Sequence, residues 1–145
     1  GRSEIMAKLS PAGPVYQAGT LSGNPVAVAA GMATLAKLQP ALYAELEETG
    51  AALEARLASA VAARGCTMRR VGSMFTIFFR ATPPRNFTQV SQCEMGAFGR
   101  FHRAALKRGV YLPPSQYEAA FLPASLSPEE MDHLVAGIQG ALAEA

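Results

Sequence analysis

The segment that most constrains the fold is a glycine-rich loop that runs directly into an apolar helix. The loop reads Gln17-Ala18-Gly19-Thr20-Leu21-Ser22-Gly23-Asn24-Pro25. Asn24 suits the N-cap position and Pro25 the first helical position, where a missing N–H has no cost. The helix that follows, to Leu38, is apolar on nearly every side, and such a helix is normally buried by other structure. Because little of the remaining sequence is sufficient to cover it, we expect further chain or a partner subunit to do so.

The same loop has the composition of an anion site. Gly19 and Gly23 allow close approach of a ligand, Thr20 and Ser22 carry hydroxyls, and a helix N-terminus follows. These groups suit a phosphate, although an ordinary loop-to-helix junction has the same composition. The loop matches neither a Walker-type nor a dinucleotide fingerprint, so its residues alone leave the anion unidentified.

Composition argues against several classes of function. The 145 residues are half apolar with a formal net charge of +2, which shows no excess that would point to nucleic acid. No apolar run is long enough to span a bilayer, and no signal-peptide pattern opens the sequence. Cys66 and Cys93 have no metal-like or redox spacing, and no histidine is spaced to join a metal site. We therefore expect a cytoplasmic protein with two reduced thiols and no metal, nucleic-acid or membrane partner.

Hydrophobic periodicity predicts an α+β fold. A stripe of leucines and Val61 marks one long helix, and Ser127, Pro128 and Glu130 form a capping box that starts the last helix. After Cys66 the expected order is β-α-β-α. In chain order we expect helices over residues 2–9, 25–38 and 40–64, a strand or hairpin over 68–80 that bends at Gly72-Ser73, a helix over 94–108, a short strand over 110–112, and a helix from 128.

Three sequence words, found in one order, carry a resemblance to a known family. They are Tyr16-Gln17-Ala18-Gly19-Thr20-Leu21-Ser22-Gly23-Asn24-Pro25, then Gly72-Ser73-Met74-Phe75, then Gly109-Val110-Tyr111-Leu112-Pro113-Pro114-Ser115, which is followed by Glu118-Ala119. This set resembles the C-terminal part of the glutamate-1-semialdehyde 2,1-aminomutase family, pyridoxal-phosphate enzymes of the class III aminotransferase group. The resemblance runs from Gly1 nearly to the C-terminus. The whole group shares a looser form of the first word, whereas the third favours the aminomutases.

The resemblance implies a fold and a domain organisation. The chain is expected to be the C-terminal part of a fold-type-I pyridoxal-phosphate-dependent transferase, and thus a piece of a larger polypeptide that forms a homodimer. Residues 1–39 would be the end of the large cofactor-binding domain. Residues 40–65 would be a linking helix that contains the domain boundary, and residues 66–145 a small C-terminal α+β domain.

The resemblance also implies site residues. The position of Thr20 binds the cofactor phosphate in the family, across the dimer interface in the active site of the neighbouring subunit, and Gly19 lies beside it with a backbone amide. Glu118 matches a glutamate at the active site near the substrate, where a carboxylate bonds or repels an amino group or takes part in proton movements. From the residues alone, a surface glutamate that caps a turn fits Glu118 as well.

The covalent part of such a site is missing from this sequence. A pyridoxal-phosphate enzyme needs a lysine that holds the cofactor and an acid beside its pyridinium nitrogen. The only lysines and the only aspartate, Lys8, Lys37, Lys107 and Asp132, fall in expected helices. In the family the cofactor lysine lies upstream of the region resembled here. We therefore expect this chain alone to be inactive.

The family converts (S)-4-amino-5-oxopentanoate into 5-aminolevulinate, a step of tetrapyrrole (porphyrin) biosynthesis. Two alternatives stay open: another class III aminotransferase, and a stand-alone helical interaction or dimerisation module. Those aminotransferases commonly carry an arginine for the substrate carboxylate beyond the strand at Val110, and no arginine follows Arg108 here, which favours an aminomutase. One departure leaves the exact substrate open, because residues 122–127 lack the histidine-containing, serine-rich word usual in the family.

Overall fold

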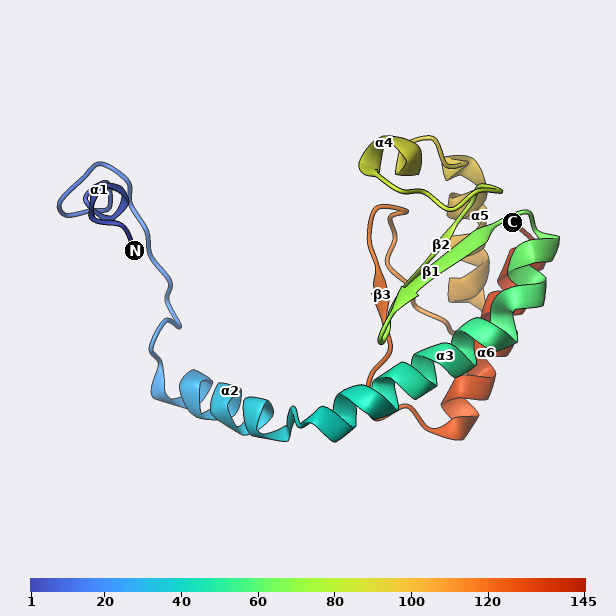
Figure 1. Cartoon of the computed structure of the whole chain (residues 1–145), viewed down its shortest axis with the longest axis horizontal. Helices are drawn as coiled ribbons and strands as arrows, with labels where there is room; N and C mark the ends of the chain where they lie inside the picture. Colours follow the sequence, from blue (N-terminus) through green and yellow to red (C-terminus); the bar gives the residue numbers. More distant parts are fainter. The chain divides into compact units, whose positions relative to one another are not determined.

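The structure, a computed structural model, describes all residues from 1 to 145 and divides them into two compact units, Gly1–Leu38 and Gln39–Ala145. The first unit contains helices α1 (Ser3–Met6) and α2 (Pro25–Lys37) and the loop between them (Figure 1). Helix α1 is shorter than the predicted 2–9, because the backbone beyond it bonds within the loop instead. The N–H of Ser10 donates to the carbonyl of Val15, and the N–H of Val15 donates to that of Lys8.

Helix α2 confirms the predicted helix to within one residue. Asn24 caps it, since its Oδ1 accepts from the N–H groups of Val26 and Ala27 at 3.0 and 3.1 Å. Every residue of the helix is exposed, and Met32 and Leu35 each expose 67% of their surface. Nothing else within the first unit covers this apolar helix.

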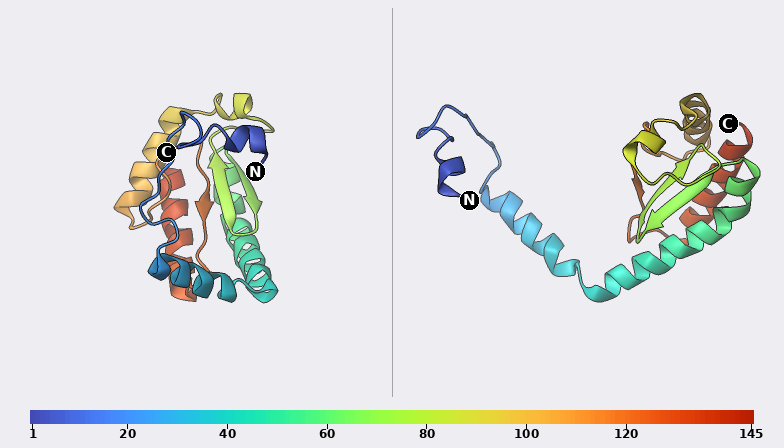
Figure 2. Two further views of the ribbon diagram at one scale, coloured as in Figure 1. Left: turned by 90° about the vertical axis from the view of Figure 1, so that its left-hand side faces the viewer. Right: turned by 45° about the horizontal axis from the view of Figure 1, so that its top comes forward.

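The second unit combines a small antiparallel sheet with helices. Its long helix α3 (Pro40–Ala63) leads into the hairpin of β1 (Thr67–Val71) and β2 (Met74–Phe78), whose two-residue turn has Gly72 at a φ of +57°. Hairpin turns of this length need such a backbone, which glycine adopts without strain. The remaining elements are α4 (Phe87–Val90), α5 (Met95–Lys107), β3 (Ala120–Phe121) and α6 (Pro128–Ala143). The three strands lie side by side in the order β1-β2-β3 (Figure 2).

The strand predicted over residues 110–112 is wrong. Burial alternates along this segment as it would in a strand, since Val110 and Leu112 are buried while Tyr111 is 80% exposed. The segment does not pair with the sheet, however. Strand β3 instead occupies the free edge of β2, where Met74 pairs with Phe121 and Phe75 with Ala120. The predicted β-α-β-α order is therefore corrected to β-β-α-α-β-α with all pairing antiparallel.

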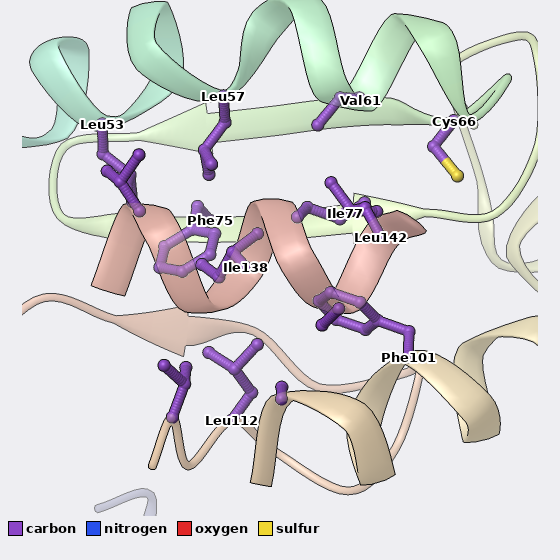
Figure 3. Close-up of a cluster of buried hydrophobic side chains, with 14 of the residues drawn as sticks. Leu53, Leu57, Val61, Cys66, Phe75, Ile77, Phe101, Leu112, Ile138 and Leu142 are labelled. Carbon is purple, nitrogen blue, oxygen red and sulfur yellow. The ribbon is translucent and has the colours of Figure 1, made fainter. Parts of the chain in front are cut away.

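One hydrophobic core lies between α3, the hairpin, α5 and α6 (Figure 3). The side chains that meet there include Leu53, Leu57 and Val61 of α3, Phe75 and Ile77 of β2, Phe101 of α5, and Ile138 and Leu142 of α6. The predicted stripe of α3 is thus confirmed from Leu53 onward. Cys66 and Cys93 are free thiols, as expected, and burial raises the pKa of each.

A polar clamp joins α3 to the hairpin. The guanidinium of Arg70 donates to Glu47 at 2.7 and 2.9 Å, to Glu54 at 3.1 Å and to the carbonyl of Gly72 at 2.9 Å. Hydrogen bonding to Arg70 lowers the pKa of the Glu47 carboxyl. Helix α3 therefore belongs to the same unit as the sheet. The predicted domain boundaries at residues 39 and 65 stay a prediction about the complete protein.

We expect Ser127→Ala to lower the free energy of unfolding of the second unit by about 1 kcal/mol. Ser127 Oγ accepts from the N–H of Glu130 at 3.2 Å, and Glu130 Oε2 accepts from the N–H of Ser127 at 2.8 Å, so the predicted capping box is present. Urea unfolding followed by far-ultraviolet circular dichroism measures the loss. Ser125→Ala, in the exposed loop just before, is the control, and an equal loss in both variants would contradict the capping role.

Candidate functional site

The loop that carries Gly19 and Thr20 forms a tight turn in the first unit. The N–H of Ser22 donates to the carbonyl of Gly19 at 3.0 Å, and the N–H of Asn24 donates to that of Leu21 at 3.1 Å. A Cβ at Gly19 would meet Ser22 Oγ, so a side chain there would require the Ser22 hydroxyl to turn away. Thr20 is exposed at the turn, and neither its hydroxyl nor its backbone N–H bonds within the chain.

This turn fits a phosphate, but differently from the sequence-based expectation. The amides of Val26 and Ala27 at the start of α2 are already taken by the Asn24 side chain, so the helix N-terminus is not the donor. The donors of the turn that stay free are the N–H groups of Gly19, Thr20, Leu21 and Gly23 and the hydroxyls of Thr20 and Ser22. Hydrogen bonds from such groups to an ionised oxygen are stronger than neutral ones.

The lysines of the chain and its aspartate all lie on the surface. All three lysines are exposed at or next to the ends of helices: Lys8, Lys37 and Lys107. The only aspartate, Asp132, accepts a hydrogen bond from Arg56 at 2.7 Å on the surface of the second unit. That the cofactor lysine and the acid beside the pyridinium nitrogen come from another part of the protein stays a prediction.

The second candidate, Glu118, lines an open pocket of about 810 Å³ in the second unit. Most of the residues that line it are apolar. They belong to the segment around Tyr111, to β3 and its neighbours, and to α6. The pocket's titratable residues are Tyr111, Glu118, Glu129, Glu130 and His133, and it contains no arginine or lysine. The family-atypical residues Leu122, Pro123 and Leu126 also line it, so the departure noted in the sequence falls on a pocket wall.

The loop that presents Glu118 is held by hydrogen bonds at several points. The N–H of Glu118 donates to the carbonyl of Ser115 at 3.1 Å, and Ser115 Oγ accepts from the N–H of Tyr117 at 3.2 Å. Thr76 Oγ1 donates to the carbonyl of Glu118 at 3.4 Å. The carboxylate itself is exposed, free to contact a ligand.

Two further side chains, those of His102 and Gln116, hold this loop through hydrogen bonds to the backbone. The Nε2 of His102 in α5 lies 3.0 Å from the carbonyl oxygen of Leu112, where the loop begins. Gln116 was not singled out. It is 2% exposed, and its side chain bonds to the backbone of Ile77 and Phe79. No periodicity marks a buried amide in a loop, so nothing in the sequence pattern indicated it.

None of the helices has the length and apolar character that crossing a membrane requires. Thr20 and Glu118 lie in different units, so they are two separate candidates.

Comparisons with known proteins agree with the resemblance found in the sequence. The chain is 51% identical over 145 residues to a glutamate-1-semialdehyde 2,1-aminomutase of Sorangium cellulosum, which covers 99% of this chain and 33% of the relative. It is 47% identical over 146 residues to the Thermus thermophilus enzyme of the same name, covering 98% and 34%. The chain thus spans about a third of the length of the curated relatives it matches. No protein-family model matches it.

Solved structures share the fold. An omega-transaminase from Sphaerobacter thermophilus matches with a TM-score of 0.78 and 26% identity over 99% of this chain and 34% of its own. A glutamate-1-semialdehyde aminomutase from Pseudomonas aeruginosa PAO1 matches with a TM-score of 0.77 and 23% identity over 97% and 32%. The predicted α+β fold is confirmed, as one third of a pyridoxal-phosphate transaminase fold, consistent with a C-terminal portion.

Proposed function

We propose that this chain is a segment of a glutamate-1-semialdehyde 2,1-aminomutase. In the complete enzyme it would help to convert (S)-4-amino-5-oxopentanoate into 5-aminolevulinate, a cytoplasmic isomerase step of tetrapyrrole biosynthesis. The observation that carries the proposal is 51% identity along 99% of the chain to an enzyme of that name. The 145 residues alone are proposed to be inactive, because none of their lysines is placed to hold the cofactor.

Thr20 and Gly19 would bind the phosphate of pyridoxal phosphate. The free hydroxyl and amide of Thr20 donate to phosphate oxygens, while Gly19 keeps the turn narrow enough to present them. In a homodimer this turn would enter the active site of the neighbouring subunit. The exposed apolar surface of α2 supports such an assembly, since contiguous apolar surface of this kind marks an interface or missing cover.

Glu118 would act on the substrate. Pyridoxal phosphate supplies the electron sink through which an amino group changes position. The exposed carboxylate of Glu118, at the wall of the pocket, accepts a hydrogen bond from the substrate amino group or takes its proton.

Another class III aminotransferase is the second candidate, favoured by the structural match to transaminases. Its substrate carboxylate would need a cation, however, and the pocket contains no arginine or lysine. A stand-alone interaction module is the third candidate, favoured by the exposed apolar residues of α2.

One assay separates these candidates. The protein encoded by the complete reading frame around these codons is incubated with (S)-4-amino-5-oxopentanoate as the only substrate. Formation of 5-aminolevulinate without an added amino acceptor is expected. Turnover that requires a second amino compound would identify an aminotransferase instead. No turnover, with self-association of the 145 residues that pyridoxal phosphate does not affect, would support the interaction module.

We expect Thr20→Val to weaken pyridoxal-phosphate binding to the complete enzyme by roughly 10- to 100-fold, because a hydrogen bond to a charged group contributes about 1.5–3 kcal/mol. Titration of the apoenzyme, followed by cofactor absorbance, measures the dissociation constant. Thr34→Val is the matched control, since the Thr34 hydroxyl bonds only to the α2 backbone at Ala30. Equal affinity in the Thr20 variant and the unsubstituted enzyme would remove Thr20 from the phosphate site.

A further inference from the structure

Gln116 is the only polar side chain buried in the core, with 2% of its surface exposed. Its Nε2 donates to the carbonyl of Ile77 at 2.9 Å, and its Oε1 accepts from the N–H of Phe79 at 3.3 Å. Both ends of the amide are therefore satisfied by the backbone of β2 and the residue that follows it. A buried amide without partners would cost free energy, so these two hydrogen bonds are what allows Gln116 to be buried here.

The segment from Gln116 to Phe121 follows the edge of β2 although only its last two residues form a strand. Ala120 pairs with Phe75, and the carbonyl of Glu118 accepts from Thr76 Oγ1. Further along β2, the side chain of Gln116 takes the place of a paired backbone at Ile77 and Phe79. Glu118 therefore lies between two attachments to the same strand, one through the Gln116 side chain and one through the β3 backbone.

We propose that Gln116 is the positioning residue for Glu118. By fixing one end of this segment to β2, it holds the Glu118 carboxylate at the pocket wall instead of letting the loop detach. Glutamine suits the place, because its amide donates to the carbonyl of Ile77 from one atom while it accepts from the N–H of Phe79 at another. The inference rests on the proposed function, since it requires Glu118 to act on a substrate.

A role confined to stability predicts a different result from a positioning role. If Gln116 only stabilises the core, its loss lowers the amount of folded enzyme whatever stands at residue 118. If it positions Glu118, its loss has no further effect once the carboxylate is gone. Catalysis is sensitive to such placement, because a shift of about 1 Å in a reacting group can cost about 100-fold in rate.

The test is a double-mutant cycle in the complete enzyme, with Gln116→Met, Glu118→Gln and both together. We expect Gln116→Met to lower kcat roughly 10- to 100-fold when Glu118 is present, and to leave kcat unchanged when residue 118 is already glutamine. Gln139→Met is the matched control. The Gln139 side chain also donates to a backbone carbonyl, that of Arg56 at 3.0 Å, but lies outside the pocket, so its kcat should not change.

Hydrogen exchange of the Glu118 amide provides a second readout that needs no activity. We expect faster exchange in Gln116→Met than in Gln139→Met. If Gln116→Met does not fold, Gln116→Asn, whose shorter side chain cannot reach both partners, replaces it in the cycle.

The outcomes separate the inference from the proposed function. An active enzyme in which the two substitutions lower kcat independently would overturn the positioning role alone. So would unchanged exchange at Glu118. An unsubstituted enzyme that does not convert the substrate would overturn the proposed function and the positioning role together.

Discussion

We expect Glu118→Gln to lower kcat of the complete enzyme by about 100-fold or more, as is typical when a group that transfers protons is lost. The substitution keeps the size of the side chain and removes its charge and its ability to take a proton. The side chain is exposed and makes no ion pair or hydrogen bond within the chain, so the stability of the fold should not change.

Steady-state kinetics with a single substrate measure the effect. Glu48→Gln, an exposed carboxylate of α3 far along the chain from the pocket residues, is the control and should retain full kcat. A Glu118 variant with kcat close to that of the control would show that the carboxylate is only a surface group.

We expect Gly50→Ala to destabilise the second unit by about 1–3 kcal/mol, although alanine is the better helix former by about 1 kcal/mol. Gly50 is buried in the middle of α3, where the hairpin turn comes closest. An added Cβ would lie 2.4 Å from the carbonyl oxygen of Gly72 and 3.0–3.1 Å from the Arg70 side chain. The turn and the Arg70 clamp would have to move away from the helix.

Urea unfolding of the 145-residue chain measures this change in the free energy of unfolding. Gly96→Ala in α5 is the matched control, because a Cβ there would meet only Arg100 Nη1 at 3.8 Å. The control should be as stable as the unsubstituted chain or slightly more so. If Gly50→Ala instead gains stability as the control does, the hairpin turn does not lie as close to α3 as described here.

The helices were predictable because their signals are local. The Asn24-Pro25 start of α2, the leucine stripe of α3 and the Ser127 capping box all lie within a few residues of the structure they specify. Each prediction was right to within about two residues, as is usual for helix ends. The exception is α1, which ends early because loop pairing with Val15 competes for its last residues.

The sheet was less predictable because its third strand depends on pairing between distant residues. Val110 and Leu112 alternate with exposed Tyr111 as a strand would, yet the edge of β2 is taken by Gln116 and Ala120. A two-residue strand has no periodicity of its own, and the selection of one segment over another at an edge is a tertiary effect.

The candidate site was predictable only in part, for a similar reason. Thr20 and Glu118 came from a family resemblance, while their residue chemistry alone fitted a plain turn and a surface carboxylate. The structure adds that the Asn24 side chain occupies the first helix amides while the amides of Thr20 and Leu21 stay free, and that the Gln116 side chain bonds to the backbone of Ile77 and Phe79. Both facts depend on side-chain hydrogen bonds that no sequence pattern specifies.

The central claim is that this chain is the part of an aminomutase that lacks the cofactor lysine. The most direct measurement is the nucleotide sequence immediately upstream of the codon for Gly1. We predict an open reading frame that continues upstream and encodes a lysine followed by a glycine-rich stretch. A start codon directly before Gly1 would contradict the claim, and would leave a stand-alone protein with no residue to hold pyridoxal phosphate.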